Sequence, residues 1–332
     1  MLYKKDNTNG KDSKIGTVSE NRSSNKDLVL QPLFMAAEGG KLYHYDFASD
    51  SLSLVFEDER KETMMGLVKN GDDLYVGAKT RVHKLNIHNG HVYKYIKSSK
   101  ELLKRKFSLR KRDPGFHQIS IIEDFLYVTS TGFNEIWKMD LDLNLVKAYK
   151  IRPPRRFLPV RYKWNYNHLN NIIFHNDKFY VCLNWLTSKQ YGPSGVAVLN
   201  SQMREVERFE YGWETHNFSI FGGRRYVLVA SSGAIKQVDH PHRGGLMVDG
   251  EVVFEHDPDS FFCKDFSVDD NFIYIVGGSV NKRDVRNRSR GVVFVLDKTY
   301  SLLEKKEFPD SGGFCGCLLR NKDLTKVFGS HQ

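Results

Sequence analysis

The sequence of 332 residues lacks long apolar runs and has only four cysteines. Residues 1–27 contain no apolar stretch of about seven residues, which a secretory leader needs, and no later segment approaches about 18 consecutive apolar residues, the length of a membrane-spanning helix. Cys182, Cys263, Cys315 and Cys317 are too few for a disulfide framework in so long a chain, which favours a reducing compartment. These absences predict a soluble, cytoplasmic protein, which we expect to be a monomer.

Signatures of catalysis and segments with helical period are also scarce. The chain has no HExxH, no CxxC pair and no EF-hand loop, and the two cysteines at 315 and 317 are too close together for a usual zinc knuckle. Residues 1–27 are rich in Asn, Ser, Lys and Gly and are expected to form a disordered, basic and polar tail. Residues 28–332 are expected to form a single β-rich domain.

Positive charge and aromatic residues, in contrast, are abundant. The formal net charge is +10, which favours an anionic partner such as nucleic acid, an acidic sugar, a phosphorylated or sulfated metabolite, or a membrane surface. Aromatic residues make up 13% of the chain and hydrophobic residues 40%, enough for a large core. The composition therefore predicts a folded protein, without choosing among these partners.

One short phrase recurs six times along the chain. Each copy alternates apolar and other residues and ends on Asp or Asn, whose side chain caps a strand end. A second strand precedes each phrase and a fourth follows most of them, and the terminal Asp or Asn residues lie 39 to 60 residues apart. Such units are typical of propeller blades, which must stack radially because one unit cannot bury both of its faces. The copies are KLYHYD (41–46), RVHKLN (81–86), EIWKMD (135–140), GVAVLN (195–200), AIKQVD (234–239) and VVFVLD (292–297).

The repeat predicts an all-β protein, a six-bladed β-propeller of four-stranded antiparallel blades. Strands from the N-terminal and C-terminal parts of the chain are expected to close one blade. The C-terminal stretch GFCGCLLRNKDLTKVFGS has the pattern of two strands, so a seven-bladed ring with a shared blade is the alternative.

Aligning the blades on their second strands reveals two largely polar columns at the start of the innermost strands. Because innermost strands surround the central channel, these residues are expected to ring one of its mouths. His168 lies two residues before Asn170 and reaches the same space by the two-residue period of a strand. The first column is Met65, His117, Asn170, His216, Lys264 and Cys315, and the second is Gly66, Gln118, Asn171, Asn217, Asp265 and Gly316.

Three interpretations of these columns remain open. In the first, the polar side chains bond to one another and to channel water and hold the blades together. In the second, His117, His168 and His216 bind a metal ion, with Zn, Cu, Fe and Mn suited to neutral imidazoles. In the third, His117 or His216 is a general acid or base, with Lys264 and Asp265 adjusting its pKa and holding an anionic substrate group. In the last two, Gln118, Asn170, Asn171 and Asn217 contact the substrate.

Three long basic loops are predicted on the face of the ring where the innermost strands begin. They span residues 97–116, 152–167 and 279–290. Clefts lined by one sign of charge attract ligands of the opposite sign. We expect Arg152, Arg155 and Arg156 to neutralise substrate charge, and Trp164 to stack on a sugar ring or a base.

The blades resemble those of the broad superfamily of six-bladed propellers that includes the regucalcin and lactonase group, virginiamycin B lyase-like proteins and arylsulfotransferases. The segment HLNNIIFHNDKFYV is similar to the His-x-Asn strand entry of arylsulfotransferase propellers, and this similarity extends to His168 and Asn170. The acid-and-amide metal ligands of the regucalcin group are not matched, which argues against a calcium lactonase. A shared fold of this kind does not determine chemistry.

The leading prediction is a metal- or histidine-dependent enzyme that acts on an anionic small molecule or glycan at the basic mouth of the channel. Its catalytic residues would be His117, His216, Lys264 and Asp265. The alternative is a non-enzymatic scaffold that binds nucleic acid or an acidic protein through its basic, aromatic face, with steeply salt-dependent affinity. A purely structural propeller domain is the third possibility.

Overall fold

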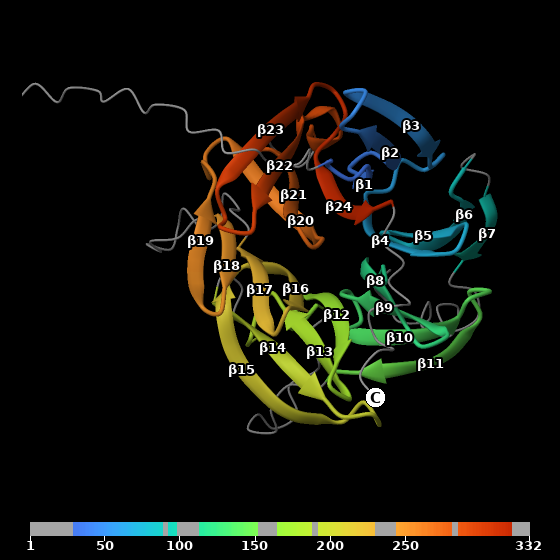
Figure 1. Ribbon diagram of the computed structural model, residues 1–332. Coiled ribbons are helices and arrows are strands. Elements are labelled where there is room, and N and C mark those ends of the chain that lie inside the picture. The colour runs from blue at the N-terminus through green and yellow to red at the C-terminus, as the bar shows by residue number, and fades with distance from the viewer. Residues whose placement is uncertain are drawn as a thin grey trace, which may run out of the picture.

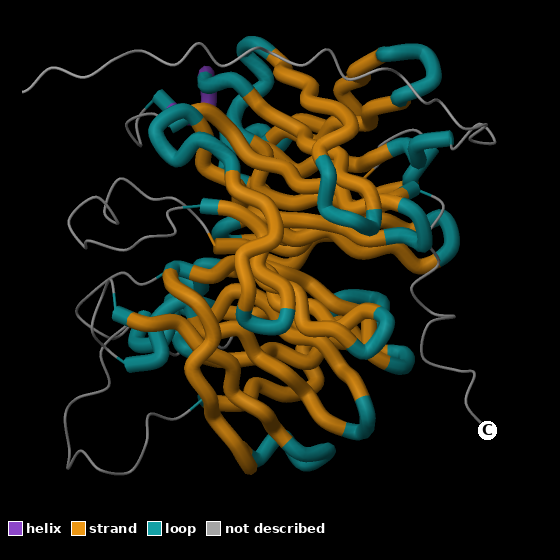
Figure 2. The backbone as a smooth tube through the Cα atoms, turned by 60° about the vertical axis from the view of Figure 1, so that its left-hand side comes forward, coloured by secondary structure: helices purple, strands orange, loops and turns teal. Residues whose placement is uncertain are grey.

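The computed structural model describes residues 29–88, 92–97, 113–151, 165–187, 192–229, 244–280 and 285–320. They form six antiparallel sheets of four strands each, and the sheets are the blades of a closed ring (Figure 1). Strands occupy most of the thickness of the ring, and loops lie on its two sides (Figure 2). The predicted six-bladed β-propeller is confirmed.

Each blade runs from an innermost strand at the channel to an outermost strand at the rim. In that order, blade 1 contains β24 (Phe314–Leu319), β1 (Leu33–Ala37), β2 (Lys41–Asp46) and β3 (Ser51–Glu57); blade 2 contains β4 (Met64–Asn70), β5 (Asp73–Ala78), β6 (Arg81–Asn86) and β7 (Val92–Lys97); blade 3 contains β8 (Phe116–Ile122), β9 (Phe125–Ser130), β10 (Glu135–Asp140) and β11 (Leu145–Lys150). Blade 4 contains β12 (Leu169–His175), β13 (Lys178–Leu183), β14 (Pro193–Leu199) and β15 (Glu205–Trp213); blade 5 contains β16 (Thr215–Phe221), β17 (Arg224–Val229), β18 (Gly245–Val248) and β19 (Glu251–Glu255); blade 6 contains β20 (Phe261–Val268), β21 (Phe272–Ser279), β22 (Gly291–Asp297) and β23 (Leu302–Phe308).

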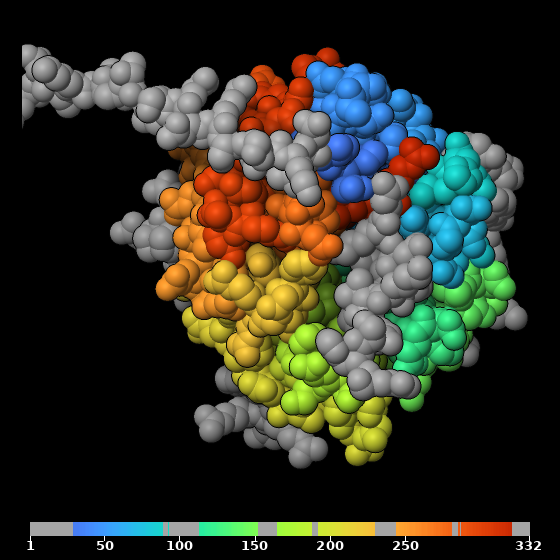
Figure 3. Space-filling model, in the orientation of Figure 1, coloured from blue at the N-terminus to red at the C-terminus, as the bar shows by residue number. Residues whose placement is uncertain are grey.

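Blade 1 closes the ring by pairing strands from the two ends of the chain. The innermost strand β24 lies antiparallel to β1, with Leu33 opposite Leu319 and Phe34 opposite Leu318. In the surface view, the first and last described parts of the chain adjoin at this blade (Figure 3). The predicted closure is confirmed; of the C-terminal stretch, the described residues end at 320 and contribute one strand to the ring, β24. β1 already occupies the second place in blade 1, so the seven-bladed alternative is wrong.

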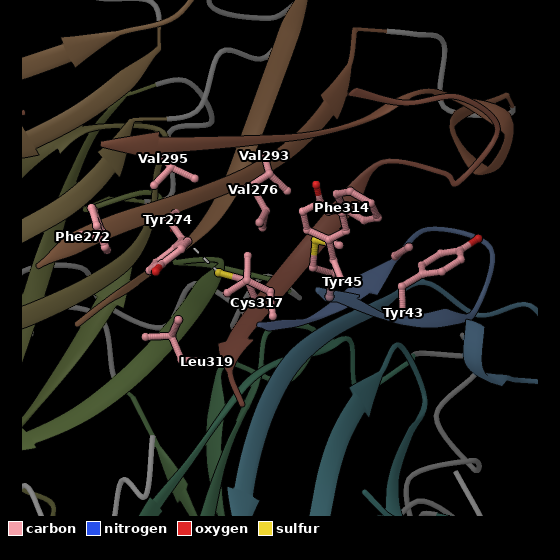
Figure 4. Packing of buried hydrophobic residues seen from close by; sticks show 13 residues of the cluster. Tyr43, Tyr45, Phe272, Tyr274, Val276, Val293, Val295, Phe314, Cys317 and Leu319 are labelled. Atoms are coloured by element: carbon pink, nitrogen blue, oxygen red, sulfur yellow. Dashed lines mark hydrogen bonds between the residues drawn. The ribbon is translucent and has the colours of Figure 1, made fainter. Parts of the chain in front are cut away.

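The hydrophobic core consists of six clusters, one between each pair of neighbouring blades. Between blades 6 and 1, Tyr274 and Val293 of blade 6 pack with Tyr45 and Phe314 of blade 1 (Figure 4). The middle strands are therefore covered on both faces, and β22 is buried along almost its whole length. Radial stacking buries both faces of a blade, as the repeat predicted.

The Asp or Asn at the end of the repeated phrase caps the turn between the third and fourth strands. Asp297 Oδ1 accepts hydrogen bonds from the amides of Thr299 at 2.8 Å and Ser301 at 2.9 Å. Asp46, Asn86, Asp140 and Asn200 accept the equivalent amide two residues on. The phrase AIKQVD at 234–239 lies outside the described residues, and the third strand of blade 5 is instead β18.

We call the face of the ring where the innermost strands begin the head face. The segments 97–116 and 152–167 connect outermost strands to the next innermost strands, and 279–290 connects β21 to β22, so all three leave the blades on this face. The last of them includes the short 3-10 helix η2 (Arg286–Arg288). Across the described ranges, no helix has the length and apolar character needed to cross a membrane.

Candidate functional site

Each innermost strand contains a β-bulge close to its start on the head face. In blade 6, Cys263 lies opposite Gly277 and Asp265 opposite Val276, so Lys264 is an extra residue. The other five blades show the same two-against-one pairing. A bulge interrupts the alternation of side chains and re-aims two neighbouring residues. The bulged pairs are the two columns predicted from the sequence: Met65–Gly66, His117–Gln118, Asn170–Asn171, His216–Asn217, Lys264–Asp265 and Cys315–Gly316.

Side chains of the second column bind the next blade around the ring. Asn171 Nδ2 of blade 4 donates to Asn217 Oδ1 at 2.9 Å and to the carbonyl of Phe218 at 2.7 Å, and Asn171 Oδ1 accepts the Phe218 amide at 2.9 Å. Asn217 of blade 5 donates to the carboxylate of Asp265 in blade 6. Asp265 Oδ2 accepts the amide of Cys317 in blade 1 at 2.8 Å. The first interpretation, in which polar groups hold the blades together, therefore describes this column.

Two glycines of the second column also contribute to the contact between neighbouring blades, because the backbone of the next blade lies very close to them. A Cβ on Gly316 would lie 1.8 Å from the carbonyl oxygen of Met65 in blade 2, and a Cβ on Gly66 would lie 2.6 Å from that of His117 in blade 3. Both distances are far below van der Waals contact, and both obstacles are backbone atoms. Glycine is needed at these two positions because the next blade occupies the place of a side chain.

Asp265 is the carboxyl group on which these links converge. It is 3% exposed, and besides Cys317 and Asn217 it accepts the amide of Phe266 at 2.9 Å and a hydrogen bond from the Gln118 side chain. Gln118 belongs to blade 3, which lies opposite blade 6 in the ring, so this last bond crosses the channel. Burial raises the pKa of Asp265 to about 7, outweighing the four donors, which lower it. We therefore assign Asp265 a structural role.

Two histidines of the first column, His117 and His216, lie near a third histidine, His168, at the channel mouth. The ring centroid of His117 in blade 3 lies 5.1 Å from that of His168 and 6.4 Å from that of His216 in blade 5. His168 precedes β12 with a φ of 49° and donates from Nδ1 to Asn165 Oδ1 at 3.1 Å, which leaves Nε2 unprotonated when the ring is neutral. The rings of His168 and His216 thus each lie near the ring of His117.

Burial keeps His117 and His216 neutral. It lowers the pKa of both imidazoles well below 6.5, and the nearby His168 and Lys264 lower it further, because one positive charge disfavours another. Both side chains remain partly exposed. In the part of the chain that the structure describes, neither ring makes a hydrogen bond to another residue. Each therefore presents a neutral imidazole nitrogen that is available to a ligand.

Lys264 lies in the first column next to these histidines. Its Nζ donates to Glu38 Oε1 at 2.7 Å and to Cys315 Sγ at 3.2 Å, and it lies 5.2 Å from the ring centre of Phe262. Glu38 follows β1 in the loop to β2, and its side chain is 11% exposed. The ammonium group is thus held at the mouth by a carboxylate from blade 1, which the sequence did not predict.

Two polar atoms beside the histidines have no hydrogen-bond partner within the described residues. Asn170 is 1% exposed; its Nδ2 donates to the carbonyl of Thr215 at 2.6 Å, whereas its Oδ1 is unpaired. Trp185, whose ring centroid lies 5.1 Å from that of His168, has an unpaired indole N–H. A buried unpaired acceptor and donor are costly unless a ligand or water completes them.

The donor set at the mouth is of a type that transition metals accept. Imidazoles suit Zn, Cu, Fe and Mn, and the rings of His168 and His216 lie 5.1 and 6.4 Å from that of His117. In the present arrangement of the described side chains, however, no group of three or more His, Cys, Asp or Glu residues forms a metal-binding cluster. Metal binding stays a prediction.

Some of the predicted substrate-binding residues lie in the described part of the chain, and the others lie outside it. Gln118, Asn171 and Asn217 lie in the blade-linking network, and Asn170 also bonds to blade 5 through Nδ2 while its Oδ1 has no partner among the described residues. Arg152, Arg155, Arg156 and Trp164 lie outside the described residues. Sequence reasoning missed Glu38, although it occurs in a loop between a second and a third strand, which was expected on the head face.

Comparison with known proteins identifies the fold and no family. No protein-family model and no curated protein sequence matches the chain. A protein of unknown function from Bacteroides caccae is similar in structure, with 10% identity, a TM-score of 0.61, and coverage of 86% of this chain and 97% of that one.

Two further solved structures are similar. For a chain of the nidogen/laminin complex the identity is 9%, the TM-score 0.53 and the coverage again 86% and 97%; for a streptogramin B lyase the values are 11%, 0.47, 84% and 79%. At such low identities, likeness shows the propeller fold alone.

Proposed function

We propose that the protein is a histidine-dependent enzyme that acts on an anionic small molecule or glycan at the head-face mouth of the channel. In this proposal, the neutral imidazoles of His117 and His216 transfer protons, and Lys264 neutralises substrate charge. The observation that carries the proposal is the contrast between the two columns. The second column is engaged in blade-to-blade bonds, whereas these two imidazoles are partly exposed and make no hydrogen bonds to described residues.

Proton transfer requires a base that is unprotonated at the working pH and within reach of the substrate. The lowered pKa keeps His117 and His216 neutral at pH 7 and well into the acid range. The unpaired Oδ1 of Asn170 and the indole N–H of Trp185 offer one acceptor and one donor to orient a polar ligand. A hydroxyl-rich or acidic sugar matches this combination.

The choice of an anionic substrate rests on charge. Lys264 carries a positive charge and contacts Cys315, another residue of the first column, and the chain has a formal net charge of +10. A substrate carboxylate or ester anion could replace Glu38 as the partner of the ammonium group. Ion pairs in such partly buried places are stronger than exposed ones, because solvent screens them less.

A divalent or redox metal held by His117, His168 and His216 is the second candidate. It is favoured by the distances of 5.1 and 6.4 Å that separate the His117 ring centroid from those of His168 and His216, and by the lowered pKa of His117 and His216. The three side chains would have to rotate to direct one nitrogen each at a common point. When bound, the metal would supply Lewis-acid or redox chemistry.

The experiment is a turnover assay with oligogalacturonates, sulfate monoesters and phosphate monoesters, using the wild type, His117→Gln and His216→Gln. We expect turnover of one class by the wild type and a loss of about 100- to 10,000-fold in both variants, the usual contribution of a general acid or base. The matched control is His256→Gln. His256 is also buried, with a lowered pKa, but it stacks on Phe294 at 6.0 Å.

Two results would contradict the enzyme proposal: no turnover of any class, or an equal loss in His256→Gln. The Zn, Cu, Fe and Mn contents of the same four proteins test the second candidate. A stoichiometric metal that is lost in both channel variants and kept in His256→Gln would establish a metal site, and wild-type protein without metal would refute it.

A further inference from the structure

Lys264 and Cys315 form a contact that the proposed chemistry does not use. The two residues are the extra residues of the bulges in β20 and β24, so they belong to neighbouring blades on either side of the seam where the ring closes. The amine nitrogen lies 3.2 Å from the sulfur and 2.7 Å from Glu38 Oε1, and the sulfur lies 3.9 Å from the same carboxylate oxygen. A thiol, an amine and a carboxylate are therefore in mutual contact.

The other three cysteines have different surroundings. Burial raises the pKa of Cys182 to about 12 and also raises the pKa of Cys263, which suppresses their reactive thiolate forms. The sulfur of Cys317 lies 4.0 Å from the backbone carbonyl of Tyr274. A neighbouring amine thus distinguishes Cys315.

We propose that peroxide converts Cys315 and Lys264 into a reversible sulfenamide cross-link. In the first step, the sulfur attacks hydrogen peroxide: the O–O bond breaks, an S–O bond forms, and Cys315 becomes a sulfenic acid while the peroxide is reduced to water. In the second step, the Lys264 amine attacks the sulfur, an S–N bond forms, the S–O bond breaks, and the hydroxyl leaves as water. Sulfenic acids condense with nitrogen and sulfur nucleophiles in this way, and thiols reverse the reaction.

The surrounding groups suit both steps. The ammonium group must lose a proton before its nitrogen can attack, and Glu38 Oε1, hydrogen-bonded to Nζ, is placed to accept it. The side chains of Lys264 and Glu38 are 12% and 11% exposed, so solvent reaches the pair although Cys315 itself is only 4% exposed. Hydrogen peroxide is little larger than water and needs no wider opening.

The cross-link has a consequence for the channel mouth, which rests on the proposed function. It removes the positive charge of Lys264, which the proposal assigns to the substrate anion and which lowers the pKa of His117 and His216. It also joins blade 6 covalently to blade 1. Oxidation would therefore switch the enzyme off while strengthening the closed ring.

The test uses the wild-type chain treated with hydrogen peroxide, digested without reducing agent and analysed by peptide mass spectrometry. We expect the peptides containing Lys264 and Cys315 to be joined with the loss of two hydrogen atoms, and to separate again after dithiothreitol. Lys264→Arg and Cys315→Ser should abolish the joined species. Cys317→Ser, a matched change two residues along the same strand, should retain it.

Recovery of treated Cys315 as a free thiol or sulfinic acid, with Lys264 open to trypsin, would overturn the proposal. An additional oxygen atom in the joined peptides would overturn the S–N bond. The mass measurement needs no substrate, so its failure would leave the enzyme proposal intact, and absence of turnover would leave the cross-link intact.

Discussion

Replacing Asp265 by Asn changes the carboxyl group that links blades 3, 5, 6 and 1. The substitution keeps the shape and one carbonyl-type oxygen, which can still accept from Asn217 and the Phe266 amide. The other oxygen, Oδ2, accepts the amide of Cys317 at 2.8 Å in the wild type. In the variant an NH₂ group takes its place, and a donor then faces the Cys317 N–H. Leaving that buried amide unpaired costs about 1–3 kcal/mol of stability.

The pH dependence of this change has a definite sign. Asp265 has a pKa of about 7 in the folded protein against an ordinary value of 3.8. Between these values the folded state holds the proton and the unfolded state does not, so the contribution to stability is fully present below pH 3.8 and is lost as the pH rises through 7. From pH 5 to pH 8 the wild type loses about 3 kcal/mol, at about 1.4 kcal/mol for each of roughly two pH units. Asp265→Asn has no such loss.

The assay is urea unfolding of both proteins at pH 5 and pH 8, followed by tryptophan fluorescence. We expect the variant to be less stable than the wild type at pH 5 and to equal or exceed it at pH 8. Asp249→Asn is the control, because the amide of Arg225 and the guanidinium of Arg224 hold the pKa of that exposed carboxyl below 3.8 and its effect is constant above pH 5. A wild-type-to-Asp265→Asn difference that is equal at the two pH values would refute the reasoning.

Two further predictions concern the ring and its histidines. Gly316→Ala places a methyl group against the Met65 carbonyl and should destabilise the fold by about 3 kcal/mol or more, and an unchanged melting temperature would contradict the close approach. The pKa of His117 and His216 is lowered on folding, so their contribution to stability is present above pH 6.5 and lost as the pH falls below it. The wild type should therefore lose more stability between pH 7.5 and pH 5 than the double variant His117→Gln/His216→Gln, as measured by thermal unfolding. An equal change in the two proteins would argue against neutral imidazoles.

The fold could be predicted because its determinants are local and repeated. A strand that ends on Asp297 or Asp46 caps its own turn within four residues, and the repetition of that unit along the chain indicates a ring. The number of strands that each end of the chain contributes could not be predicted in the same way. The pattern of the C-terminal stretch allowed two strands, whereas the pairing of β24 with β1, from the other end of the chain, is a non-local property.

The sequence predicted where the candidate site lies, but not which of its residues bond to the neighbouring blade and which keep unpaired polar atoms. Counting back from the second strands found both columns because all six innermost strands are bulged at the same place. Nothing in the sequence distinguishes Asn171, whose Nδ2 and Oδ1 both bond to blade 5, from the adjacent Asn170, whose Nδ2 bonds to blade 5 while its Oδ1 has no partner among the described residues. Glu38 was missed because its partner Lys264 is brought to it only by ring closure.

The repeated bulge explains how this propeller keeps its ring closed while retaining polar groups at its centre. A regular strand would send neighbouring side chains to opposite faces, so only one residue of each adjacent pair could reach the seam between blades. A bulge provides two residues opposite one. The second residue is constrained by the next blade to be Gly, Asn or Asp in five blades and is Gln118, which bonds across the channel, in blade 3, whereas the first varies among Met, His, Asn, Lys and Cys. That freedom allows His117, His216 and Lys264 to meet at one mouth without loosening the blades that carry them.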